Sequence, residues 1–190
     1  SQVTNPPIDS LRENKVMSLK TRFGNLGNIL DFNNLTEENI YVLNSPILTN
    51  NQFEKFVSFF DKNNKTIDCT FKSDEDIEYK LKTIKQEAEI YVRQGVTQII
   101  LSDKNVSKEN YPVPMLLCIG AVHTHLTKMK LRGYVSINVQ TGEALDTHSF
   151  ATLIGVGATT VNPYLALDSL YQRFEKKLFG KFLYEECVER

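Results

Sequence analysis

Two carboxylates stand directly after predicted strands, at positions where parallel α/β enzymes place their chemistry. Asp103 follows the apolar run at 97–101, and Glu143 follows the run at 134–139. Because the functional groups of parallel sheets collect at the carboxyl ends of the strands, we expect both side chains on one rim together with Asn162. Two carboxylates there could act as general acid and base. Polar residues at such positions more commonly cap helices or anchor loops, so we assign no catalytic residue.

The three histidines do not form a metal-binding pattern. His123 and His125 fall within a predicted helix at 114–130, and His148 lies in a different segment. Two residues that are two positions apart on a helix point about 200° apart around its axis. His123 and His125 therefore cannot ligate one metal ion from the same helix face, and we predict no metal site.

Cysteine and glycine spacing also gives no complete cofactor site. Cys69, Cys118 and Cys187 are too scattered for a zinc site, a disulfide framework or an iron–sulfur cluster, and they fit a reducing compartment such as cytoplasm or plastid. The glycine-containing segment 155–158 (GVGA) lacks the third glycine of a dinucleotide fingerprint and precedes its strand. No phosphate-binding P-loop sequence occurs. We therefore predict that this chain binds no cofactor.

The elements that would position these residues alternate regularly from residue 66 onward. Four apolar runs predict strands at 66–71, 97–101, 134–139 and 159–161, and helical periodicity predicts helices at 49–61, from Ser73 to Gly95, at 114–130, at 146–154 and from Pro163 onward. Strands of about five residues joined through helices need crossover connections, which make neighbouring strands parallel. The predicted fold class is therefore α/β.

Four strands are too few to close an eight-stranded barrel, so we expect parallel βα units that resemble an incomplete (β/α) barrel with an exposed edge. Residues 1–38 are predicted to be an N-terminal extension containing a helix that Asp9 or Ser10 caps and that ends near Lys20. Residues 39–190 are predicted to form the α/β domain.

Composition narrows the possible partners. The 190 residues include 22 basic and 23 acidic side chains, and no basic stripe interleaved with aromatic residues is present, so nucleic acid binding is not expected. The longest apolar run, 115–122, is far shorter than the roughly 20 residues that span a membrane. We expect a soluble protein. No methionine precedes the opening turn at 4–7 (TNPP), so we also expect the chain to be a piece of a larger protein.

Several blocks, taken in order, resemble the central domain of the glutamate synthase large chain. They are residues 2–9 (QVTNPPID) with 12–13 (RE) and 16–19 (VMSL), 43–49 (LNSPILT), 100–103 (ILSD), 114–117 (PMLL) with 120–123 (GAVH), 141–143 (TGE), and 157–158 (GA) with 161–166 (VNPYLA). A series of ordered blocks that extends along nearly the whole chain is far more specific than any one motif.

This resemblance implies a parent enzyme that makes two glutamates from glutamine and 2-oxoglutarate. An amidotransferase domain of the parent would release ammonia, and an FMN-binding domain would reduce the imino intermediate with the help of an iron–sulfur cluster and a reduced electron donor. The central domain would join those two domains of the same chain. It would be noncatalytic, would bind neither flavin nor iron–sulfur cluster, and would contribute to the wall of an ammonia tunnel.

Within the opening block, Thr4 and Asn5 are our candidates for the tunnel wall. They offer polar backbone and side-chain groups beside the rigid turn at Pro6 and Pro7, and such groups suit the passage of a small neutral molecule. A simple linker turn is the alternative role of this segment.

Two other functions stay open from the residues alone. The chain could be an independent barrel-like enzyme that uses Asp103 and Glu143 at the strand ends on a small substrate. It could instead be an interaction module that pairs through an open sheet edge.

Overall fold

A computed structural model describes residues 18–24 and 40–189. Residues 1–17, which contain most of the predicted N-terminal helix, lie outside the described residues. The chain divides into two compact units, Ser1–Pro46 and Ile47–Arg190. In the first unit, β1 (Thr21–Phe23) pairs antiparallel with β2 (Tyr41–Leu43), a hairpin that the sequence did not predict. The predicted domain boundary after residue 38 falls outside the described residues and stays a prediction.

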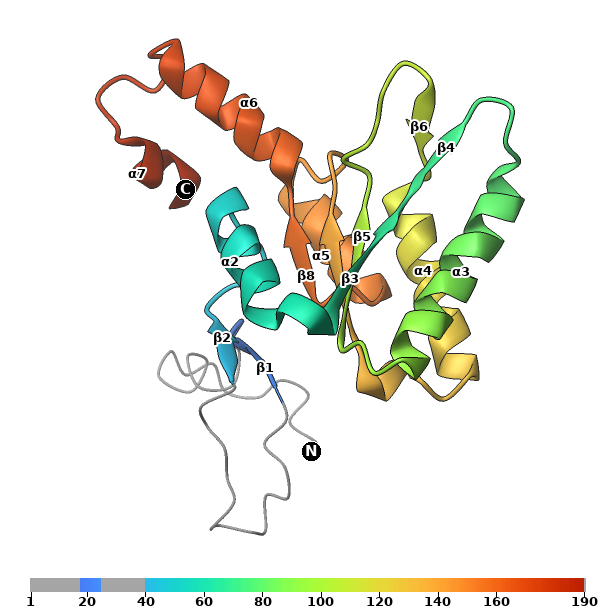
Figure 1. Cartoon of the computed structure of the whole chain (residues 1–190). Coiled ribbons are helices and arrows are strands. Elements are labelled where there is room, and N and C mark those ends of the chain that lie inside the picture. The colour runs from blue at the N-terminus through green and yellow to red at the C-terminus, as the bar shows by residue number, and fades with distance from the viewer. Residues whose placement is uncertain (1–17, 25–39, 190) are drawn as a thin grey trace, which may run out of the picture. The chain divides into compact units, whose positions relative to one another are not determined.

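The second unit is built on a four-stranded parallel sheet. Its strands are β3 (Asn64–Asp68), β5 (Gln98–Ser102), β7 (Ser136–Gln140) and β8 (Thr160–Asn162), in the order β3-β5-β7-β8. The crossovers contain α3 (Ile77–Arg93), α4 (Met115–Lys128) and α5 (Thr147–Val156). Each strand therefore pairs with the next strand of the βα series, and the described strands do not close into a barrel (Figure 1). This arrangement confirms the predicted α/β class and the incomplete βα arrangement.

The two faces of the sheet differ in chemistry. Ile67, Leu101, Val139 and Val161 form one row across the four strands and belong to the main core together with buried residues of α3, α4 and α5. The next row, one residue further along each strand, consists of Asp68, Ser102, Gln140 and Asn162. Because successive side chains of a strand point to opposite faces, this polar row lies on the face turned away from the three helices.

The segment before β3 lies on the other side of the sheet from α3 and α4 (Figure 1). It contains α2 (Asn50–Phe60), and Thr49 and Gln52 form a capping box at its start. The helix buries Phe53, Phe56 and Phe60, whereas Val57 is only half-buried. Ahead of the helix, Ile47 bridges to Val161 in parallel, so this segment covers part of the outer edge of β8.

The predicted strand at 66–71 is two strands in the structure. The Asp68 carboxylate accepts hydrogen bonds from the backbone N–H and hydroxyl of Thr70 and turns the chain out of the sheet. Beyond Cys69, β4 (Thr70–Lys72) pairs antiparallel with β6 (Asn110–Pro112), which the sequence did not predict. The helix that follows was predicted to start at Ser73.

That predicted start is wrong, because Asp76 is the residue that caps α3, through the N–H of Glu78. The strand predicted at 134–139 begins two residues later in the structure, at Ser136. Arg132–Tyr134 instead forms the 3-10 turn η3, and a similar turn, η2, spans Asp61–Asn63.

The chain ends with α6 (Tyr164–Glu175) and α7 (Tyr184–Glu189), which pack against each other beyond β8. The predicted helix after Pro163 corresponds to α6, whereas α7 was not predicted. Among the described residues, no helix is both long enough and apolar enough to cross a membrane.

Two glycines at the end of α5 provide a test of the packing between α5 and α4. Gly157 has a φ of 133°, and a Cβ there would lie 2.6 Å from Nδ1 of His123, whereas a Cβ on Gly155 would meet nothing within 4 Å. We predict that Gly157→Ala lowers the free energy of unfolding by about 1–3 kcal/mol because the backbone is strained and the ring must move. Gly155→Ala should raise it by roughly 0.5–1 kcal/mol. Urea unfolding of both variants checks the prediction, and equal effects would contradict it.

Candidate functional site

The Asp103 carboxylate is the centre of the hydrogen bonding at the rim where the parallel strands end. Asp103 directly follows β5 and is 1% exposed. It accepts hydrogen bonds from the Thr141 hydroxyl at 2.5 Å and from the Gly142 N–H at 3.1 and 3.2 Å. Both donors belong to the loop after β7. The carboxylate therefore fixes the end of β5 to the end of β7.

Tyr164, the first residue of α6, lies near the same carboxylate, and its hydroxyl would be 3.1 Å from a Cβ placed on Gly142. Burial and then the neighbouring Asp103 charge raise the pKa of Tyr164 to about 12. The phenol thus stays protonated at neutral pH. Sequence reasoning missed this contact, and the only local signal was the position of Tyr164 immediately after a strand and a proline.

Glu143 lies at the same rim and caps a helix. Its Oε2 accepts a hydrogen bond from the backbone N–H of Met115 at 2.9 Å, at the first residue of α4. Pro114, the residue preceding this helix, makes no side-chain cap, so Glu143 supplies a negative group where the helix exposes unpaired N–H groups. Thr141 connects the Asp103 carboxylate with the backbone of Glu143, because its hydroxyl donates to Asp103 and accepts from the Glu143 N–H.

Asn162 ends β8 and links the polar row to the segment before α2. The Ser102 hydroxyl donates to Gln140 Oε1 at 2.9 Å, and Gln140 Nε2 donates to Asn162 Oδ1 at 3.2 Å. Asn162 Nδ2 then donates to the Leu48 carbonyl and to Asn50 Oδ1, both at 3.0 Å. At the predicted rim position, the completely buried Asn162 thus joins two segments that are distant in the sequence.

The two histidines of α4 have separate partners. His123 Nδ1 accepts a hydrogen bond from Arg132 Nε at 3.1 Å, and the same guanidinium donates to the carbonyls of Val135 and Gly157. Burial lowers the pKa of Arg132. Arg132 thereby ties α4 to the start of β7 and to the end of α5.

His125 forms a second contact, to α3. Its Nε2 lies 2.6 Å from Glu89 Oε2, and the other oxygen of Glu89 accepts from Arg93 Nε at 2.8 Å. Hydrogen bonds from Arg93 and then from His125 lower the pKa of Glu89. Sequence reasoning could not find this pair, because 36 residues separate Glu89 from His125.

The cysteines form no metal-binding cluster among the described residues. Cys69 and Cys118 are buried, and a hydrogen bond with Cys118, together with burial, raises the pKa of the Cys69 thiol. Within residues 18–24 and 40–189, no three His, Cys, Asp or Glu side chains are grouped so that they could hold a metal ion. Thr4 and Asn5 lie outside the described residues.

The fold and the rim define an open parallel βα domain in which strand-end polar groups hold loops and helices in place. The sequence matches the family described as the glutamate synthase central domain over residues 1–189, and the chain belongs to that family. The resemblance found in the sequence blocks is thereby confirmed.

Three relatives illustrate the similarity. The chain is 49% identical to the glutamate synthase [NADPH] large chain of Azospirillum brasilense over 98% of this chain. It is 41% identical to the corresponding large chain of Bacillus subtilis over 100% of this chain. It is 38% identical to the chloroplastic ferredoxin-dependent glutamate synthase of Spinacia oleracea over 90% of this chain. The matched stretch spans only 12%, 12% and 11% of the length of these relatives, respectively.

The hydrogen bonds of Asp103 predict the effect of one isosteric change. Asp103→Asn replaces an accepting oxygen with an NH₂ group, which leaves at least one of the buried donors around it unpaired. We predict a loss of about 1–3 kcal/mol in the free energy of unfolding. Urea unfolding measures this loss, with exposed Asp74→Asn as the matched control, for which we expect a change within about 0.5 kcal/mol. Equal losses in the two variants would contradict the prediction.

The lowered pKa of Glu89 predicts a pH dependence of stability. A carboxylate whose pKa is lower in the folded than in the unfolded chain stabilises the fold above the unfolded value of about 4.3. That contribution is lost as the pH falls further, through the native pKa. Glu89→Gln should therefore lose less stability than wild type between pH 6 and pH 3, both pH values being chosen for urea unfolding. Glu87→Gln on the same helix is the control and should keep the wild-type pH dependence.

Proposed function

We propose that this chain is a noncatalytic domain that joins the amidotransferase and FMN-binding domains of a glutamate synthase. The family match over residues 1–189 supports this role, and so does the small share of the relatives that the chain spans. The longer protein would make glutamate from glutamine and 2-oxoglutarate. FMN and the iron–sulfur cluster would be bound by other parts of that protein.

The main support for the joining role is that β8 contacts the segment before α2 along its edge and leads into α6 at its end. On its edge, β8 holds the incoming segment, through the Ile47–Val161 bridge and the bond from the Leu48 N–H to the Val161 carbonyl. At its end it continues through Pro163 into the outgoing helix α6. A domain that transmits position between two others needs its incoming and outgoing segments fixed to one rigid element.

The polar groups of the rim support a noncatalytic role over that of an independent enzyme. Asp103 accepts hydrogen bonds from the loop after β7, and Glu143 caps α4. A general acid or base must instead reach a substrate proton within hydrogen-bonding distance. Both carboxylates of the alternative mechanism are used within the fold.

Thr4 and Asn5 are proposed to line the path of ammonia in the longer protein, on the strength of their position in the opening sequence block. A reducing compartment, cytoplasm or plastid, is proposed for the protein. The free thiols of Cys69 and Cys118 support that proposal.

The joining role is tested with the full-length protein, and Thr4 and Asn5 are tested in the same experiment. Glutamine hydrolysis and glutamate formation are measured together, with the isolated 190-residue chain assayed beside it for turnover and flavin absorbance. We expect coupled glutamate synthesis from the full-length protein and a colourless, inactive 190-residue chain. Flavin binding or turnover by the short chain would overturn the proposal.

In the full-length protein, Thr4→Val and Asn5→Leu should raise the ratio of glutamine hydrolysed to glutamate formed, because they remove polar groups from the proposed path. Asn14→Ala, which changes a polar residue later in the same segment, is the control and should leave that ratio unchanged. An unchanged ratio in all three variants would remove the tunnel role while leaving the joining role in place.

A further inference from the structure

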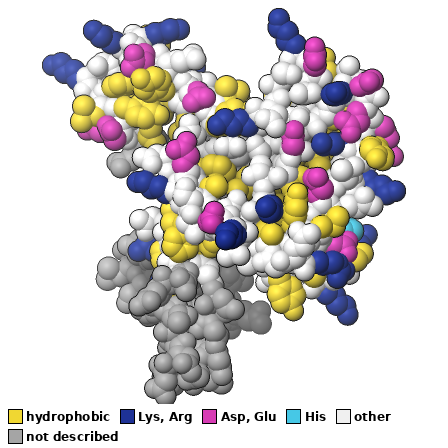
Figure 2. All heavy atoms as spheres, viewed as in Figure 1, with side chains coloured by type: hydrophobic (Ala, Val, Ile, Leu, Met, Phe, Trp, Pro, Cys, Tyr) yellow, Lys and Arg dark blue, Asp and Glu magenta, His cyan; other side chains and the backbone are white. Residues whose placement is uncertain are grey.

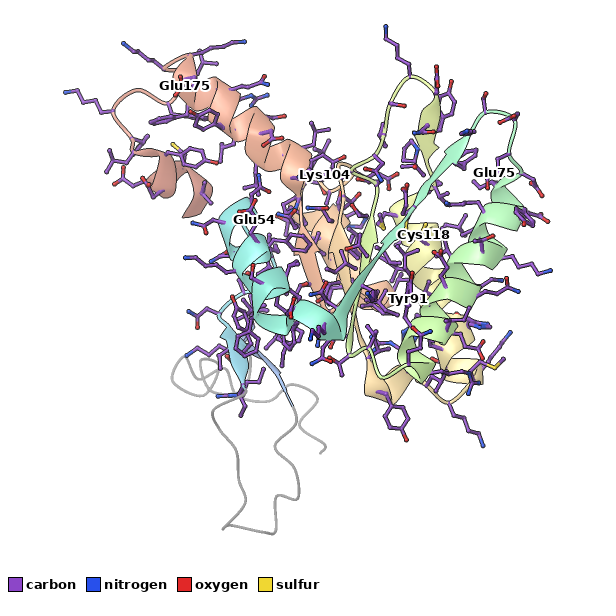
Figure 3. The ribbon with its side chains drawn as sticks, viewed as in Figure 1. Glu54, Glu75, Tyr91, Lys104, Cys118 and Glu175 are labelled. Atoms are coloured by element: carbon purple, nitrogen blue, oxygen red, sulfur yellow. The ribbon has the colours of Figure 1, made fainter. Side chains whose placement is uncertain are left out.

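Two buried cysteines that the proposed function does not use, Cys69 and Cys118, belong to the main core. Cys69 stands between β3 and β4, and Cys118 lies in the first turn of α4. Both residues are 0% exposed. Figure 3 shows Cys118 on α4, the helix that packs against α3. The pair thus lies between the end of a sheet strand and the start of a helix that covers the sheet.

Val113 contacts both cysteines. The Cys69 carbonyl accepts a hydrogen bond from the Val113 N–H at 2.8 Å. The Cys118 thiol donates to the Val113 carbonyl, with the sulfur 3.8 Å from the oxygen. The Cys69 N–H also donates to the Ser102 carbonyl at 2.8 Å, so the backbone of Cys69 is held on both sides. The fold therefore keeps the two thiols as neighbours.

The buried setting makes this pair slow to react. The Cys118 side chain and then burial raise the pKa of the Cys69 thiol. The thiolate, not the thiol, is the form that attacks a disulfide. Figure 2 shows basic and acidic side chains interspersed over the α3 and β4 part of the surface, whereas a thiolate is favoured by concentrated positive charge. We therefore expect the pair to react only through local opening, over minutes to hours.

We propose that Cys69 and Cys118 are a redox-sensitive pair that forms a disulfide when a low-molecular-mass disulfide, R–S–S–R, is the oxidant. One cysteine thiolate attacks a sulfur of the oxidant, which releases RS⁻ and leaves a mixed disulfide on the chain. The other cysteine then attacks the bonded cysteine sulfur and releases the second RS⁻. The two thiol protons pass to the two leaving groups, so the chain loses two electrons and the oxidant becomes two RSH. An excess of RSH reverses both steps and restores the dithiol.

The disulfide fastens the start of α4 to the end of β3. Thiols on a flexible chain meet at an effective concentration of about millimolar, whereas groups that a fold holds as neighbours reach far higher values. The disulfide therefore forms more readily in the folded than in the unfolded protein, and by linkage it stabilises the fold by the same factor. The same turn of α4 contains Met115, whose N–H Glu143 caps, so the cross-link acts beside the rim. The inference does not depend on the joining role, because both cysteines lie within one compact unit.

Equilibration of the full-length protein with graded ratios of oxidised to reduced glutathione tests the pair. After overnight incubation, free thiols are alkylated and the linked peptides are identified by mass spectrometry without reduction, both for the folded protein and in urea. We expect a peptide linked through Cys69 and Cys118 that dithiothreitol removes, and an equilibrium constant at least about tenfold larger in the folded protein. An equal or smaller constant would overturn the proposal. So would two thiols that stay free, or glutathione on both cysteines without a link between them.

Variants and amide hydrogen exchange test what the link does. Cys69→Ser and Cys118→Ala should each abolish the linked peptide, whereas Cys187→Ser, which changes the half-buried cysteine of α7, is the control and should keep it. In the oxidised wild type, the amides of residues 115–118 should exchange at least about tenfold more slowly than in the reduced protein, because opening of this turn has to strain the link. The amides of α6 should not change. A linked peptide without slower exchange would contradict the fastening of α4.

Discussion

The constraint on which the rest of the fold depends is the need to pair the polar side chains on the face of the sheet turned away from α3, α4 and α5. A parallel sheet commonly carries apolar residues on both faces, and an unpaired buried polar group costs about 1–3 kcal/mol. Here Ser102, Gln140 and Asn162 bond to one another across three strands, and the last free donor of the row reaches the Leu48 carbonyl. The segment before α2 is thus held because the sheet needs its acceptor.

Hydrophobic periodicity was sufficient to predict the sheet, because the row of Ile67, Leu101, Val139 and Val161 is encoded in short local runs. It failed where side chains redirect the backbone. The Asp68 carboxylate ends β3 by bonding to Thr70, and nothing in the apolar run 66–71 indicates this turn. The capping box at Thr49 was predictable because both of its partners lie within three residues.

The candidate site shows the same division between local and distant signals. The strand-end positions of Asp103, Glu143 and Asn162 could be predicted because each one closely follows or ends an apolar run. Their partners could not, because Asp103 bonds to a loop 38 residues away and Asn162 to a carbonyl 114 residues away. A carboxylate after a strand has the same local sequence whether it meets a substrate or a neighbouring loop. The resemblance of the ordered blocks to a family identified the class of protein, which the isolated positions could not identify.

The buried Asn162 and Asp103 explain how a small domain can fix the segment before α2 and the loop after β7 to the sheet without a large core between them. Asn162 and Asp103 stand at the ends of β8 and β5. Asn162 donates to the Leu48 carbonyl, and Asp103 accepts from Thr141 and Gly142. β5 and β8 are separated in the sheet only by β7. Gln140 at the end of β7 bonds to Asn162, and Thr141 in the loop after β7 bonds to Asp103. Hydrogen bonds to a carboxylate in a buried site are strong, so the loop after β7 is held firmly at the end of β5. The polar rim thus fixes the segment before α2 to the ends of three neighbouring strands, β8, β7 and β5.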